Sequence, residues 1–185
     1  TNGGLNDNFS DGSFGAPKRV LSLLGSKGTE PLAWNGQTPD FETQVRNSIV
    51  STMKSKDPPD EEKIEWIANY VRSLPPPPSL AEARGRMNRA LVAEGRRTFL
   101  RLGCTNCHRG PRFTSGKSYD VGLKDEQDRS RFNPPSLLGL SQRGPYFHDG
   151  RAESLDDVLN KFRHQVPPSA SGEELENLKQ FLLSL

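Results

Sequence analysis

Histidine, cysteine, methionine and long apolar runs are scarce in this chain of 185 residues. A zinc site needs four ligands, but the chain has only two cysteines and three histidines, in no finger-like pairs. Hydrophobic residues make up 32% of it and the mean hydropathy is −0.74, so an all-protein core would be thin. No apolar run could span a bilayer. A net charge of +2 is too balanced to predict binding to nucleic acid or to an anionic membrane.

The most informative feature that is present is the pentapeptide C-x-x-C-H, formed by Cys104, Cys107 and His108. This pattern attaches haem c through two thioethers, and the histidine supplies an iron ligand. A redox dithiol, half of a zinc site and a simple disulfide are the alternatives. Redox dithiols usually follow a strand in a βαβ unit, and none is visible here. We therefore predict one covalently bound haem c, whose porphyrin would add the apolar contact area that the sequence lacks.

Helical periodicity dominates the remaining pattern, and a polyproline run over residues 75–78 divides it. Apolar spacing predicts helices over residues 64–74, 80–102 and 155–162. A capping box of Ser171 and Glu174 precedes a further helix at the end of the chain. No stretch alternates with a period of two, so we expect few strands and a mostly α fold.

The chain also matches itself when it is shifted by 114 positions, the separation of Ser22 from Ser136. The aligned stretches run without a gap into an amphipathic helix, and they include these pairs: Gly25 with Gly139, Pro31 with Pro145, Gly36 with Gly150, and Phe41 with Leu155. The same shift would place another C-x-x-C-H just before Thr1. We therefore expect a second haem c, attached upstream of Thr1.

Residues 132–155, FNPPSLLGLSQRGPYFHDGRAESL, together with CTNCH, resemble the bacterial di-haem cytochrome c peroxidases and their MauG-like relatives. In that family two cytochrome domains are linked in tandem. Residues 15–35, GAPKRVLSLLGSKGTEPLAWN, look like the first domain of a branch often attached to a β-propeller. The resemblance implies a partial, loop-rich cytochrome c-like domain over residues 1–74, which lacks its own C-x-x-C-H. A linker over residues 75–79 and a helical, haem-binding cytochrome domain over residues 80–185 would follow.

The second axial ligand of the iron is not determined by the motif. Phe147 stands where the resemblance implies a methionine ligand, just before a His-Asp-Gly triplet. The alternatives are His148, which would give bis-histidine ligation, Tyr146, by resemblance to MauG-like proteins, or an open position. We expect His164 on the surface near the end of its helix, where a positive charge suits the helix dipole.

Other side chains are weaker candidates. Trp34 matches His148 in the repeat, and we interpret it as a packing residue rather than a redox group. Three arginines could pair with haem propionates, and solvated loop positions are the alternative for each: Arg109, Arg112 and Arg151. Calcium between the two domains is implied by the resemblance, without residues to hold it.

Two functions fit these features. The first is electron transfer through the haem, with a small redox protein as donor or acceptor. The second is a peroxide-dependent oxidoreductase whose catalytic haem lies in the partial first domain, with Glu30 or Glu42 available as acid or base. A docking domain of a larger assembly is a third reading, in which an upstream domain or another chain is the partner. Attachment of haem c takes place outside the bacterial cytoplasm, so we expect a periplasmic or otherwise exported protein and a leader upstream of Thr1 or already removed.

Overall fold

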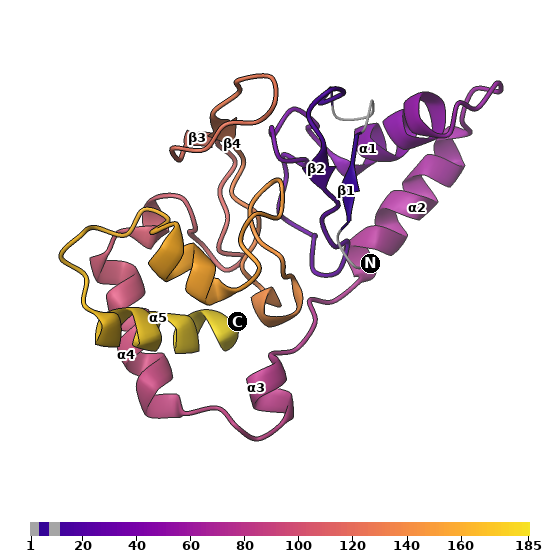
Figure 1. Cartoon of the computed structure of the whole chain (residues 1–185). Coiled ribbons are helices and arrows are strands. Elements are labelled where there is room, and N and C mark those ends of the chain that lie inside the picture. The colour runs from indigo at the N-terminus through magenta and orange to yellow at the C-terminus, as the bar shows by residue number, and fades with distance from the viewer. Residues whose placement is uncertain (1–3, 8–11) are drawn as a thin grey trace.

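The computed structural model describes residues 4–7 and 12–185, and it is mainly helical with two small antiparallel sheets, as predicted (Figure 1). The α-helices are α1 (Phe41–Asn47), α2 (Glu61–Ser73), α3 (Leu80–Ala83), α4 (Arg89–Arg101) and α5 (Gly172–Leu183). The strands pair as β1 (Leu5–Asn6) with β2 (Lys18–Arg19) and β3 (Tyr119–Asp120) with β4 (Arg131–Phe132). Short 3-10 turns span Cys104–Asn106 and Leu140–Gln142, and π-helical turns span Ser48–Thr52 and Asp157–Lys161. No helix within the described ranges is long and apolar enough to cross a membrane.

The predicted helices are present, with two differences. The helix expected over residues 80–102 is broken into α3 and α4, because Gly85 has a φ of 62° and Asn88 then caps the N-terminus of α4. The stretch 155–162 forms the π-helical turn instead of a regular α-helix. The last helix begins at the predicted capping box, in which Ser171 and Glu174 bind each other's backbone.

The internal repeat is visible in the backbone. In the first copy Leu32 forms an isolated antiparallel bridge with Thr38, and in the second copy Tyr146 forms one with Ala152, at the positions given by the shift of 114. The bridging N–H groups donate across 2.7 Å and 2.6 Å, respectively. Each bridge closes a tight loop, so the two loops are built on one frame.

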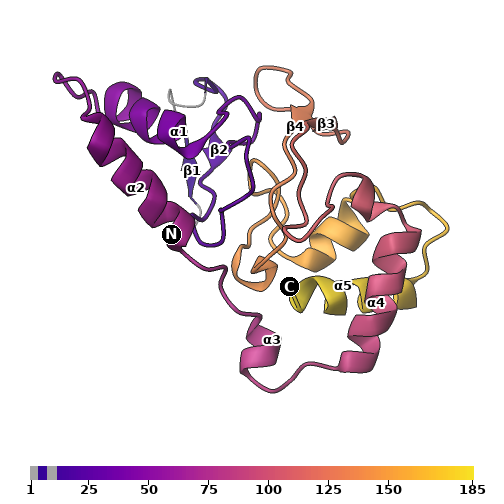
Figure 2. The ribbon, with the colours of Figure 1, turned by 180° about the vertical axis from the view of Figure 1, so that it is seen from behind.

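The two copies also exchange equivalent hydrogen bonds with each other. The backbone N–H of Arg19 donates to the carbonyl oxygen of His148, and that of Asn133 donates to the carbonyl oxygen of Trp34, both at 2.7 Å. Arg19 and Asn133 correspond in the repeat, as do Trp34 and His148. The loops of the two copies therefore pack against each other in the centre of the molecule (Figures 1 and 2).

The polyproline segment runs extended between α2 and α3 and contacts both copies of the repeat. Gly25 and Gly139 both have a φ near 70°, and a side chain on them would collide with Pro76 and Pro77, respectively. The linker thus lies against an equivalent turn of each half. The division into two cytochrome-like domains at this linker stays a prediction.

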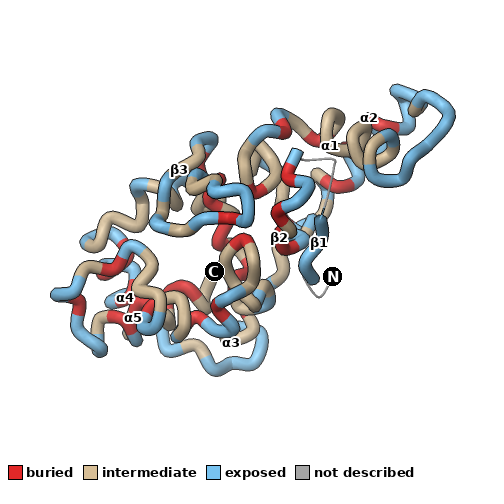
Figure 3. Tube along the Cα trace, turned by 45° about the horizontal axis from the view of Figure 1, so that its top comes forward, coloured by how far each residue is buried: buried red, intermediate tan, exposed pale blue. Residues whose placement is uncertain are grey.

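The main core lies in the C-terminal half, where α4 and α5 pack against each other (Figures 1 and 3). Gly95 allows this close approach, because a Cβ there would overlap the carbonyl of Asn177. The buried aromatic and aliphatic residues of this core include Phe99, Leu155, Leu159, Leu175, Leu178 and Phe181. The N-terminal half has a smaller core around Phe41, Ala68 and Val71.

Candidate haem site

The C-x-x-C-H motif lies on a tight turn directly after α4. Gly103 adopts a left-handed conformation with a φ of 73°, which ends the helix. The N–H groups of Cys107 and His108 then donate to the carbonyl oxygen of Cys104 at 3.3 Å and 2.9 Å. This turn presents both thiols and the imidazole from five consecutive residues, and neither cysteine is in a disulfide.

The imidazole of His108 is oriented as an iron ligand requires. Its Nδ1 donates to the carbonyl oxygen of Phe113 at 3.0 Å, which leaves Nε2 as the coordinating atom. Burial lowers the pKa of His108, and the carbonyls of Phe113 and Pro135 oppose that effect in part. The ring is therefore neutral near neutral pH, and the neutral ring is the form that binds metals.

A cavity of about 290 Å³ opens beside this turn. Its walls are largely apolar and include side chains of α4, α5 and the second repeat copy: Phe99, Leu137, Leu140, Leu155, Leu159 and Leu178. Cys104, Cys107 and His108 line it as well. A flat apolar macrocycle anchored by two thioethers suits such walls. The residues present therefore fit haem c.

The thiol alternatives have little support in this geometry. Burial raises the pKa of Cys104 to about 11, whereas a redox-active cysteine needs a lowered pKa. A metal-binding cluster of three or more His, Cys, Asp or Glu residues is absent from the described parts of the chain. Those residues therefore offer no evident binding site for zinc or calcium.

The structure brings both predicted distal candidates to the cavity wall. Tyr146 uses its hydroxyl to donate to the carbonyl oxygen of Leu140 at 3.1 Å, and burial raises its pKa. His148 is 2% exposed, its ring stacks on Phe132 with centroids 4.3 Å apart, and its Nε2 has no partner within the described ranges. Whether either side chain ligates iron stays a prediction.

His164 was expected at the surface, and the structure corrects this expectation. Its side chain lines the same cavity as His108. Arg163 and Gln165 on either side have φ values of 44° and 53°, so the chain turns sharply here and His164 points inward. Neither neighbour is glycine, so no residue type at these positions indicates such a turn.

The basic residues at the cavity also differ from those expected. Arg109 and Arg151 are exposed, and Arg151 is paired with Asp149. None of the three arginines predicted to meet propionates lines this cavity. Instead, Arg19 and Arg143 line it and also line the cavity of the first repeat copy. The guanidinium of Arg143 donates to the carbonyl oxygens of Ser136 and Leu24, and burial lowers its pKa.

Comparisons with known proteins find similar sequences and similar folds. No family model matches the sequence. The methylamine utilization protein MauG of Methylorubrum extorquens is 35% identical over 91 residues, which cover 40% of this chain and 26% of that protein. Cytochrome c peroxidase Ccp of Escherichia coli is 25% identical over 202 aligned positions, which cover 95% of this chain and 42% of that protein.

The fold agrees as well. A hydrazine synthase structure from Kuenenia stuttgartiensis superposes with a TM-score of 0.80 at 19% identity, covering 100% of this chain and 77% of that one. The chain spans less than half the length of the curated relatives it matches. In sequence the chain is therefore similar to MauG proteins and cytochrome c peroxidases, and in fold it is similar to a MauG-like protein.

Proposed function

We propose that this chain is a haem c electron-transfer module. Haem c is the cofactor that its relatives imply, and when bound it supplies a one-electron iron centre. Cys104 and Cys107 would hold it covalently, and His108 would hold the iron from below. The observation that carries the proposal is the hydrogen bond from His108 to the carbonyl of Phe113, because it directs Nε2 into an apolar cavity flanked by two free thiols.

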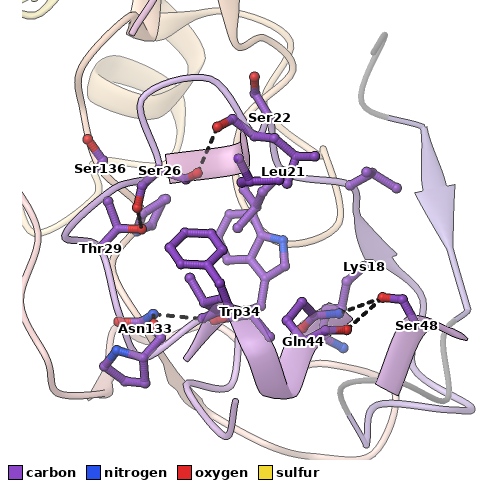
Figure 4. A pocket seen from close by; sticks show the side chains of 18 of the residues that line it. Lys18, Leu21, Ser22, Ser26, Thr29, Trp34, Gln44, Ser48, Asn133 and Ser136 are labelled. Carbon is purple, nitrogen blue, oxygen red and sulfur yellow. Dashed lines mark hydrogen bonds between the residues drawn. The ribbon is translucent and has the colours of Figure 1, made fainter. Parts of the chain in front are cut away.

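A second haem fits the cavity of the first repeat copy, which has a volume of about 490 Å³ (Figure 4). The two cavities are lined by equivalent positions, offset by 114: Leu32, Ala33, Trp34, Phe41 and Val45 in the first, and Tyr146, Phe147, His148, Leu155 and Leu159 in the second. A C-x-x-C-H upstream of Thr1 would anchor that second macrocycle. This cavity supports the division of the chain into two cytochrome-like halves at residues 75–79.

Aromatic rings lie between the two cavities and would give electrons a short route. Trp34 lines both cavities, and its ring centroid is 6.4 Å from that of His148. His148 in turn stacks on Phe132. The indole Nε1 of Trp34 donates to the carbonyl of Arg19 at 2.8 Å, which fixes the ring in place. Packing and electron transfer are compatible roles for this side chain.

Peroxide chemistry is the second candidate, because two relatives are named cytochrome c peroxidase. It requires an acid or base over an open iron. None of the described residues that line the first cavity is Asp, Glu or His. Glu42 instead forms an ion pair with Arg72 outside the cavity. The chain therefore supports electron transfer better than peroxide turnover.

The setting of this function follows from the cofactor. Haem c is attached outside the bacterial cytoplasm, so we propose that the protein is periplasmic or otherwise exported. The partner would be a small redox protein, with an upstream domain or another chain of one assembly as a further contact.

The test is to mature the full-length protein with haem c and to compare it with the Cys104→Ser/Cys107→Ser double variant. A pyridine haemochrome assay should show one covalent haem fewer in the variant. The parent protein should exchange electrons reversibly with a small redox mediator and turn over no peroxide. An unchanged haem count in the double variant would refute the site, and rapid peroxide turnover by the parent would favour the second function.

A further inference from the structure

The backbone around His164 is built to aim one side chain into the cavity. Its N–H donates to the carbonyl oxygen of Val158 at 3.0 Å, which fixes the end of the preceding π-helical turn. Left-handed conformations of non-glycine residues such as Arg163 and Gln165 are unfavourable, and they persist only where their surroundings impose them. Such local strain and π-helical turns often occur at functional positions.

The imidazole of His164 has an apolar environment on the wall of the cavity that His108 also lines. The ring of Phe147 meets it edge-on with centroids 5.4 Å apart, and Phe162 packs on the same phenyl group. The ring of His164 has no hydrogen-bond or ion-pair partner in the described part of the chain.

His148 faces a different environment. Burial lowers the pKa of His148, and the charged groups around it include Asp149 and Lys18. Its ring lies flat against Phe132, and its carbonyl accepts from the N-terminal half. These contacts place His148 at the junction of the two repeat copies, with its ring held against Phe132.

We propose that His164 is the second axial ligand of the iron held by His108. The inference rests on the proposed haem attachment at Cys104 and Cys107, and it specifies the ligand on the other side of the same cavity. Two neutral imidazoles would give a six-coordinate, low-spin iron that is closed to peroxide and suited to electron transfer.

The first repeat copy ends its helix with the same kind of turn, but five residues later than the shift of 114 would place it, because that shift pairs His164 with Val50. Ser55 donates its N–H to the carbonyl of Ile49 at 3.2 Å, six residues earlier, as His164 does to Val158. Lys54 precedes it with a φ of 58°, as Arg163 precedes His164. The hydroxyl of Ser55 donates to the carbonyl of Asp57. The two copies thus share the type of helix end but not its register, and the second copy has an imidazole at the turn where the first has a hydroxyl.

The experiment is to record EPR and absorption spectra of the full-length ferric holoprotein and of the His164→Ala variant. The difference between them isolates this haem from any other haem in the protein. We expect complete loss of its low-spin signal, appearance of a high-spin signal, and recovery of the low-spin signal when imidazole is added. Imidazole rescue would not follow from a merely structural role. His164→Met should instead produce the sulfur-to-iron charge-transfer band of His/Met ligation.

His148→Gln and Tyr146→Phe are the matched controls, since both side chains line the same cavity. Both variants should keep the low-spin signal of the parent. The proposal is overturned if this signal survives in both His164 variants, or if it is lost in His148→Gln or Tyr146→Phe. A pyridine haemochrome assay on each sample separates these outcomes from failure of haem attachment, which would contradict the proposed function itself.

Discussion

Replacement of Gly95 by alanine tests the helix packing that supports the haem motif, because α4 leads directly into the Cys104 turn. Glycine within a helix costs about 1 kcal/mol relative to alanine, so the substitution would be stabilising at an open position. Here the new methyl group would overlap the carbonyl oxygen of Asn177 and approach the Cβ of Phe181 to 2.8 Å. Overpacking costs about 1–3 kcal/mol, and the upper end applies because a helix carbonyl cannot rotate away.

The expected net result is a free energy of unfolding that is lower by about 2 kcal/mol, which corresponds to a Tm lower by about 4–8 °C in a chain of this size. Thermal and urea unfolding of the holoprotein, followed by far-UV circular dichroism, would measure it. Gly172→Ala is the matched control at the first residue of α5, since nothing lies within 4 Å of its added methyl group. A Gly95→Ala protein as stable as its parent would show that α4 and α5 do not approach this closely.

Two further substitutions probe buried charges. Asp125 is buried with Lys18, and although burial raises the pKa of Asp125, hydrogen bonds from Lys18 and Arg129 outweigh it and hold the pKa well below 3.8. The stability that this pair contributes is present above about pH 4 and is lost as the pH falls below it. Asp125→Asn leaves the Lys18 ammonium buried without its carboxylate and should lower the free energy of unfolding by about 3 kcal/mol near neutral pH. In urea unfolding at a series of pH values, the stability of the variant should fall less steeply below pH 4 than that of the parent. Equal stability of the two proteins would contradict the pairing. Arg143→Met should lower the reduction potential of the haem in a spectroelectrochemical titration, because a nearby positive charge favours ferrous iron. A potential that rises or stays constant would place the guanidinium away from the haem.

The parts of this structure that the sequence predicted are those fixed by local chemistry. Ser171 and Glu174 satisfy each other's backbone donors whatever surrounds them, so the start of α5 could be placed to the residue. The C-x-x-C-H turn needs only five consecutive residues and the glycine before them. The repeat was visible because its turns depend on glycines such as Gly25 and Gly139, which few other residues can replace.

The parts that it could not predict depend on tertiary packing. The inward direction of His164 is imposed by left-handed conformations at Arg163 and Gln165, and neither residue type indicates that conformation. Arg19 on β2 and Arg143 after the 3-10 turn Leu140–Gln142 reach the cavities from segments distant from the motif in sequence, whereas the arginines nearest the motif do not. Sequence proximity to a cofactor motif is therefore a poor guide to the charges around the cofactor.

The repeated frame explains how one chain can hold two cavities with different chemistry. The backbone bridge, the sharp loop and the π-helical turn recur in both copies, so the two cavities are enclosed by similar backbone segments. Single positions on that frame differ in side chain: Trp34 stands where the second copy has His148, and Val50 stands where it has His164. The helix end is closed in both copies by a hydrogen bond to the carbonyl six residues earlier, but it comes five residues later in the first copy. Redox properties in this architecture can therefore diverge between the two halves while their packing stays the same.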